Sequence, residues 1–178
     1  TQQKINKKSN LINVLFAPST LYESGYWSKE QRDFVLREII NAIIQNKDEI
    51  RLTVKIHPTT AILSDYESII HSLDNSIPVI QNGDIRDFLD DADIYISSDI
   101  SSGEFFSVIA KKPIIFCQFF QPNSNIILEN NLAVLCDNPK ELVKLIHSQI
   151  LKPLKEEDRQ KFIQKYLYKD DGKASERI

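Results

Sequence analysis

The chain has 178 residues, of which 42% are hydrophobic, and its 22 Lys and Arg against 25 Asp and Glu give a formal net charge of −3. This length and composition predict one domain with a sizeable core, and the charge balance gives no support for a nucleic-acid surface. The sequence has no apolar run of the roughly 18 residues that a membrane span needs, no secretory signal, and no Cys, His and Asp spacing for a structural metal. We therefore expect a cytoplasmic protein without metal or cofactor, whose Cys117 and Cys136 are reduced thiols in or near the core.

The chain contains no methionine and starts with a polar stretch. Because translation starts at methionine, we expect this chain to be a piece of a longer protein. Residues 1–11 are predicted to be a linker, and residues 12–178 are predicted to form the domain.

Short apolar runs rich in β-branched residues predict the strands, and apolar residues at helical spacing predict the helices. The predicted strands are 12–17, 51–56, 77–80, 93–97, 113–116 and 132–135. The predicted helices are 28–43, 64–73, 84–89, 101–110, one that opens at 138–141, and 156–168. Strands and helices alternate, and some strands are apolar on both faces, which is typical of a parallel sheet covered by helices. The fold class predicted is α/β, with a Rossmann-like parallel sheet and helices on both faces.

Several helix starts carry capping signals. Three serines are followed three residues later by Gln or Glu, a spacing that predicts a capping box. The three pairs are Ser28 with Gln31, Ser64 with Glu67, and Ser101 with Glu104. Asp84 and Asn138 are predicted N-caps, and Pro139 then takes the first helical position.

Glycine-rich phosphate loops are absent from the sequence. There are only four glycines, with no G-x-G-x-x-G and no Walker-type loop, which disfavours NAD chemistry. A phosphate site would have to use serine hydroxyls and the unpaired N–H groups of a helix start. In an open parallel sheet, such a site lies at the carboxyl ends of the strands.

His57 is the first candidate site residue. It directly follows the strand 51–56 and precedes Pro58, which favours an extended conformation at His57. A histidine there can donate a hydrogen bond to a phosphate oxygen or protonate a leaving phosphate. Alternatively, it merely ends the strand.

The second group of candidates follows the strand 93–97 and consists of Asp99, Ser101, Ser102, Gly103 and Glu104. Two hydroxyls and the N–H groups of a helix start would together bind a diphosphate. Capping by Ser101 and Glu104 explains the same residues, and the two interpretations do not exclude each other. On this pattern Glu104 is the reciprocal cap rather than a catalytic acid, and Asp99 orients the loop or contacts a hydroxyl.

Two further polar segments receive structural interpretations. Asp90, Asp91 and Asp93 resemble a metal cluster, but they end a helix and begin a strand, which favours a solvated turn. The segment 173–177 follows Gly172 and indicates a terminal helix start.

At these residues the sequence resembles the donor-binding half of GT-B type transferases, and in particular the CDP-glycerol glycerophosphotransferases of teichoic acid and capsule synthesis. The matching segments are Ile56-His57-Pro58, Ala92-Asp93-Ile94-Tyr95-Ile96, Asp99-Ile100-Ser101-Ser102, Lys112-Pro113-Ile114-Ile115 and Leu15-Phe16-Ala17-Pro18-Ser19. The segment 171–178 resembles the end of these enzymes and of the non-hydrolysing UDP-N-acetylglucosamine 2-epimerases. The resemblance covers about residues 12 to 178, as an ordered set of individually weak motifs.

The resemblance implies a GT-B C-terminal domain that binds a CDP- or UDP-linked donor as substrate. His57, as phosphate stabiliser or acid, and the helix start at Ser101 and Ser102 would hold the phosphates. The catalytic base would come from an acceptor domain that precedes this chain, so the chain alone is expected to transfer nothing. Peripheral association with the inner face of the membrane would also come through that domain.

Three positions depart from the family pattern. The acid that these families place in the middle of the helix falls on Phe106, Glu104 lies two residues early, and Ile100 replaces the usual tyrosine. Two alternatives follow: a UDP-sugar 2-epimerase-like domain, favoured by the tail but opposed by the serine pair and Phe106, or a non-catalytic interaction domain of the same fold.

Overall fold

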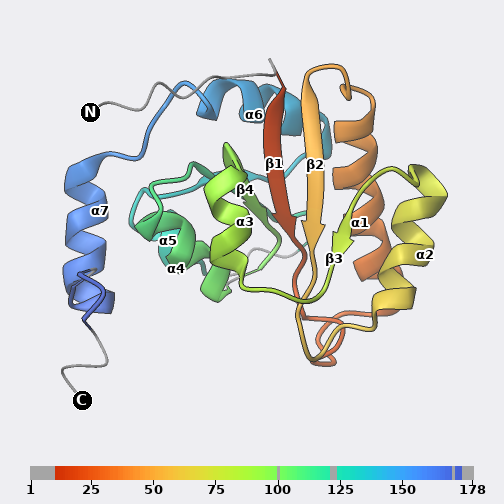
Figure 1. The fold of residues 1–178 in the computed structure, drawn as a ribbon, viewed down its shortest axis with the longest axis horizontal. Helices are drawn as coiled ribbons and strands as arrows, with labels where there is room; N and C mark the ends of the chain where they lie inside the picture. The colour runs from red at the N-terminus through yellow and green to blue at the C-terminus, as the bar shows by residue number, and fades with distance from the viewer. Residues whose placement is uncertain (1–10, 100, 121–123, 170, 174–178) are drawn as a thin grey trace.

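The computed structural model describes residues 11–99, 101–120, 124–169 and 171–173 (Figure 1). The predicted linker lies outside these residues except for Leu11, and so do Ile100 and the tail residues 174–178.

One six-stranded sheet forms the centre of the domain, and all of its strand pairs are parallel. Its strands are β1 (Ile12–Ala17), β2 (Ile50–Lys55), β3 (Val79–Ile80), β4 (Ile94–Ser97), β5 (Ile114–Cys117) and β6 (Val134–Cys136). The strand order is β3-β2-β1-β4-β5-β6. This is the order of a doubly wound sheet, so the predicted fold class is confirmed.

Helices cover both faces of the sheet. They are α1 (Lys29–Ile44), α2 (Leu63–Leu73), α3 (Ile85–Asp91), α4 (Ser102–Ile109), α5 (Ile126–Glu129), α6 (Leu142–Gln149) and α7 (Glu156–Phe162), with a 3-10 turn at Pro139–Glu141 and a π-helical turn at Ile163–Leu167. Figure 1 shows α1 and α2 on one side of the sheet and α3, α4 and α7 on the other. Two separate apolar clusters match this division: one joins the sheet to α1, α2 and α6, and the other joins it to α3, α4, α5 and α7.

The capping predictions have mixed outcomes. Ser28 and Gln31 form the predicted capping box, and the side chains of Asp84 and Asn138 cap as predicted. The box predicted at Ser64 is wrong, because α2 already begins at Leu63 and its N-cap residue makes no side-chain hydrogen bond. The apolar side of α2, with Ile69 and Ile70 buried, fixes its start against the core more strongly than a local cap does.

Other differences lie at element ends. The strand 77–80 shrinks to Val79–Ile80, the short helix α5 is not predicted, and the helix 156–168 changes to a π-helical turn at Ile163. Cys117 and Cys136 are free and buried, as predicted, and they face each other across β5 and β6.

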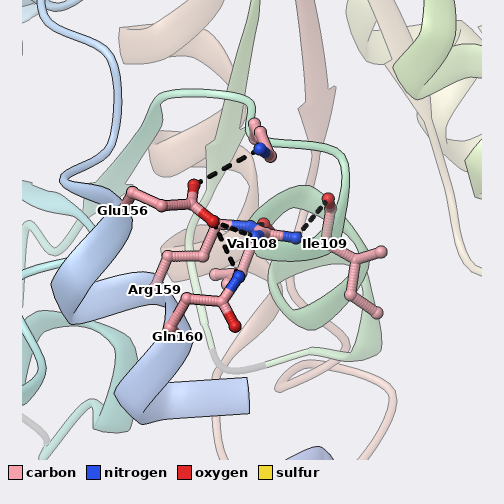
Figure 2. Close-up of polar contacts among 6 residues, drawn as sticks. Val108, Ile109, Glu156, Arg159 and Gln160 are labelled. Atoms are coloured by element: carbon pink, nitrogen blue, oxygen red, sulfur yellow. Dashed lines mark hydrogen bonds and ion pairs between the residues drawn. The ribbon is translucent and has the colours of Figure 1, made fainter. Parts of the chain in front are cut away.

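Arg159 fastens α7 to the end of α4 (Figure 2). The side chain is 3% exposed; its Nε donates to the Val108 carbonyl oxygen at 2.9 Å and its Nη2 to that of Ile109 at 3.2 Å. Glu156 pairs with Arg159 Nη1 at 2.8 Å and with Lys111 at 3.3 Å. A guanidinium at the last carbonyls of a helix satisfies groups that have no partner within the helix, and its charge suits that end of the helix dipole.

Replacing Arg159 with Met should lower the free energy of unfolding by about 2–3 kcal/mol, because buried carbonyls lose charged hydrogen bonds. Urea denaturation measures the change. Lys161→Met is the matched control, since its ammonium is exposed and, among the described residues, pairs only with Glu157 on the surface. Equal denaturation midpoints for both variants would contradict the role given to Arg159.

Candidate functional site

A cavity of about 450 Å³ opens at the carboxyl ends of the strands; we call it the edge cavity. It is lined by residues that end or follow four adjacent strands: Ala17, Pro18, Ser19, Thr20, Lys55, Ile56, His57, Pro58, Gly83, Asp84, Ile85, Asp99, Ser101, Ser102 and Gly103. The cavity lies where the strand order reverses between β1 and β4, the place where open α/β sheets bind ligands. The structure thus brings the two sequence-predicted residue groups together.

His57 is exposed in the turn that follows β2. Its Nδ1 accepts hydrogen bonds from the backbone N–H groups of Thr59 and Thr60, both at 3.3 Å. Because backbone N–H groups only donate, the proton of a neutral imidazole in this arrangement belongs on Nε2. His57 can therefore offer Nε2–H as a donor to an oxygen atom in the cavity.

The start of α4 differs from the prediction. Ser101 is the N-cap residue, but its side chain makes no capping hydrogen bond and instead lies 3.3 Å from the Tyr95 hydroxyl. The capping hydrogen bond predicted for the Ser101 side chain is therefore wrong, because the Ser101 hydroxyl contacts the hydroxyl of the buried Tyr95 instead. Ser102 is exposed, and its hydroxyl has no hydrogen-bond partner among the residues that the structure describes. The Ser102 hydroxyl and the first N–H groups of α4 therefore remain available to a ligand.

Gly103 brings the backbone of α4 close to its neighbours. A β-carbon at this position would overlap the Tyr95 hydroxyl and approach Ile85 Cδ1 to 2.8 Å. The absence of a side chain therefore lets the first turn of α4 lie against β4 and the start of α3.

Glu104 lies behind the cavity lining and is fully buried. Its Oε1 accepts a hydrogen bond from Ser97 at 2.5 Å, and the Asn125 amide lies 3.5 Å away. Glu104 Oε2 has no partner within the described part of the chain. Burial raises the pKa of Glu104 to about 7, although hydrogen bonds from Ser97, Asn125 and the Ser101 backbone act to lower it. The side chain joins the end of β4 to the first turns of α4 and α5.

Burial of Glu104 should make the protein less stable as pH rises. The folded protein keeps the Glu104 proton up to a pKa of about 7, whereas the exposed carboxyl of an unfolded chain has a pKa of 4.5. The folded state then binds more protons between these values, so stability is complete below pH 4.5 and falls until about pH 7, by on the order of 3 kcal/mol. Urea denaturation of wild type and Glu104→Gln across this range measures the loss, which the Gln variant should not show.

The control for that experiment is Glu157→Gln, because Glu157 is 79% exposed and its one ion-pair partner in the described part of the chain is Lys161. This variant should keep the wild-type pH profile. If Glu104→Gln loses as much stability with rising pH as wild type does, the loss does not come from Glu104.

Of the other residues singled out in the sequence, some line the edge cavity and others do not. Asp99 lines the cavity, whereas Phe106 packs partly buried beside the second apolar cluster, with the Arg86 guanidinium 5.4 Å from its ring. Asp93 accepts two hydrogen bonds from Asn13 and so ties β4 to β1. No group of three or more His, Cys, Asp or Glu suited to a metal ion occurs among the described residues.

Sequence reasoning missed two parts of the cavity. Lys55 lines it although it is only 5% exposed, and the loop after β1 contributes Ser19 and Thr20. A signal for Lys55 existed, because it is the one charged residue in an apolar strand end and lies two positions before His57. The loop has no such signal; the Ser19 N–H reaches Ser98 Oγ at 2.9 Å only through the tertiary fold.

A second cavity of about 450 Å³ adjoins the first and also has Asp99 in its lining. Its walls are largely aromatic, with Trp27 and Phe120 in edge contact at 5.6 Å between ring centroids and Tyr26 78% exposed. We call it the aromatic cavity.

Solved structures with a similar fold include transferases and an epimerase. The chain is 19% identical to the wall teichoic acid polymerase TagF, with a TM-score of 0.58 over 97% of this chain and 43% of that one. It is 11% identical to the glycotransferase of kitacinnamycin, with a TM-score of 0.58 over 94% of this chain and 44% of that one. A UDP-N-acetylglucosamine 2-epimerase matches at 9% identity, with a TM-score of 0.55 over 91% of this chain and 45% of that one. The chain thus spans less than half the length of each.

The fold is that of the GT-B transferases, with the edge cavity at its switch point. The model of the CDP-glycerol:poly(glycerophosphate) glycerophosphotransferase family matches residues 2–178, and the chain belongs to this family. The predicted resemblance to this family and to the GT-B fold is confirmed. No curated protein sequence matches it. Among the described residues, no helix has both the length and the apolar character to cross a membrane.

Proposed function

We propose that this chain is the donor-binding domain of a glycosyl- or glycerophosphotransferase that builds a surface polymer such as teichoic acid or capsule polysaccharide. Its ligand is a CDP- or UDP-linked donor, bound in the edge cavity. Membership of the glycerophosphotransferase family supports the reaction class. The observation that carries the proposal is the convergence of His57 and the α4 start on one cavity.

The chemistry of the cavity suits a diphosphate. Ser102 and the first N–H groups of α4 offer hydrogen-bond donors at the positive end of a helix, and His57 Nε2 offers another from β2. Donors in place before the reaction stabilise the charge that develops on a leaving nucleoside diphosphate. His57 acts there as stabiliser or as acid.

The other components of the reaction come from outside this chain. In the proposed enzyme a preceding acceptor domain supplies the catalytic base and closes over the cavity, so the isolated chain binds donor and transfers nothing. That domain also provides any contact with the inner face of the membrane.

A UDP-sugar 2-epimerase-like domain is the second candidate, supported by the fold likeness to the UDP-N-acetylglucosamine 2-epimerase structure. Phe106 opposes it, because the acid expected in the middle of α4 is replaced by an aromatic ring that does not line the cavity. A non-catalytic interaction domain would bind neither nucleotide.

Nucleoside diphosphates should stabilise the chain against thermal unfolding, because a ligand that binds only the folded state adds about 2.7 kcal/mol at one hundred times its Kd. Melting curves with CDP, UDP and their conjugates measure this, with cytidine and uridine as controls without phosphate. Tighter binding of CDP favours a glycerophosphotransferase, and tighter binding of UDP favours an enzyme that acts on a nucleotide sugar. Unchanged melting with both would refute donor binding.

Ser102→Ala should weaken CDP or UDP binding by about 1.5–3 kcal/mol, because a hydrogen bond to a charged group is lost. Its effect on folding should be small, since Ser102 is exposed and its hydroxyl is unpartnered among the described residues. Ser101→Ala is the comparison variant, because Ser101 lines the same cavity but its hydroxyl contacts Tyr95. Calorimetric titration measures the affinity. If Ser102→Ala binds CDP and UDP as tightly as wild type, the Ser102 hydroxyl does not bind the ligand.

A further inference from the structure

Lys55 is the only Lys or Arg among the described residues that line the edge cavity. It is the last residue of β2 and is 5% exposed, although lysine is almost never buried without a partner. The phosphate site predicted from serine hydroxyls and helix N–H groups gives Lys55 no role.

The position of the ammonium group follows from its hydrogen bonds. Lys55 Nζ donates to the carbonyl oxygen of Ile56 at 3.1 Å and to that of Gln81 at 2.8 Å. Both carbonyls lie just beyond the ends of β2 and β3, so the ammonium lies at the same edge of the sheet as the cavity. An ammonium has three N–H bonds, and the third has no acceptor within the described part of the chain.

The acids around the cavity do not neutralise this charge by contact. Asp84 is held by Arg86, whose Nε donates to it at 2.9 Å, and no ion pair joins Asp84 to Lys55. Burial lowers the pKa of Lys55, and the more distant Asp84 charge only opposes this effect. An anion in the cavity would supply the missing counter-charge.

We propose that Lys55 makes the edge cavity selective for the diphosphate of its ligand, with its third N–H donating to a phosphate oxygen. This inference rests on the proposed donor site and adds the cation to it. His57 and Ser102 then position the phosphates, and Lys55 balances their charge from the end of β2, where its ammonium lies beside the Ile56 and Gln81 carbonyls.

A purely structural role for Lys55, joining the ends of β2 and β3, makes a different prediction. A structural tie affects a nucleoside and its diphosphate alike, because both need the same cavity shape. A counter-charge affects only the ligand that carries phosphate. The ratio of the two affinities therefore separates the roles.

The experiment is calorimetric titration of CDP, UDP, cytidine and uridine into wild type, Lys55→Met and Lys144→Met. Met keeps the unbranched apolar stem of Lys55 and removes its charge, and Lys144 is a matched control because it is 80% exposed and does not line the cavity. Lys55→Met should weaken binding of CDP and UDP about 10- to 100-fold and leave nucleoside affinity unchanged. Lys144→Met should bind like wild type.

The outcomes separate this inference from the proposed function. Wild type that binds CDP and UDP no more tightly than the nucleosides refutes the donor site itself. If wild type prefers the diphosphates and a folded Lys55→Met keeps the same preference, the role of Lys55 is overturned and the donor site stands. Should Lys55→Met fail to fold, nitrogen-15 spectra of the wild-type lysine ammonium groups decide: the Lys55 signal should shift on adding CDP or UDP, and an unmoved signal overturns the proposal.

Discussion

The parallel pairing of β1 with β2 on one side and β4 on the other is the constraint on which the edge cavity depends. From β1 the sheet extends in two directions, through β2 to β3 and through β4 to β6. The chain leaves β1 toward α1 on one face and leaves β4 toward α4 on the other, so the two connections separate and a hollow remains between them. A hydrogen bond from the Ser19 N–H to Ser98 Oγ joins the segment after β1 to the segment after β4.

The polar groups buried beside this hollow are costly for folding. Glu104 is fully buried with one oxygen unpartnered among the described residues, and Lys55 is 5% exposed with two carbonyl partners. A domain selected for stability alone would have apolar side chains here, because buried ionisable groups destabilise unless fully paired. Violations of this kind are expected where a site needs charge and hydrogen-bonding groups held in place.

The sequence was most informative where local chemistry decides the structure. Alternating apolar strands and helices predicted the sheet, and Ser28 with Gln31 predicted a cap that depends on neighbouring residues only. The same spacing failed at Ser101, because the hydroxyl of Tyr95, six residues away in sequence, takes up the serine and Ser97 and Asn125 hold Glu104. A capping pattern cannot reveal such competition from tertiary contacts.

In the candidate site, too, residues placed by local sequence could be predicted and residues placed by tertiary contacts could not. His57 and the serine pair could be predicted because each follows an apolar strand directly, and parallel strands place their carboxyl ends at one edge. Lys55 had a signal in its place two positions before His57, but its burial could not be predicted. A charged residue at the end of a strand is ordinarily solvent-exposed, and only the Ile56 and Gln81 carbonyls explain why Lys55 is buried. The aromatic cavity also needs the fold, because it joins the loop after β1 to the segment after β5.

Burial disfavours the charged forms of both Lys55 and Glu104, but a bound diphosphate would act on them in opposite ways. Negative charge in the cavity stabilises the Lys55 ammonium, and it makes the Glu104 carboxylate still less favourable because Glu104 follows directly on the cavity-lining Gly103. Both effects raise the pKa of the protein group concerned. The occupied site therefore favours a charged lysine on one side and a neutral acid on the other. In the empty site each of these groups carries a desolvation cost that the ligand would relieve only at Lys55.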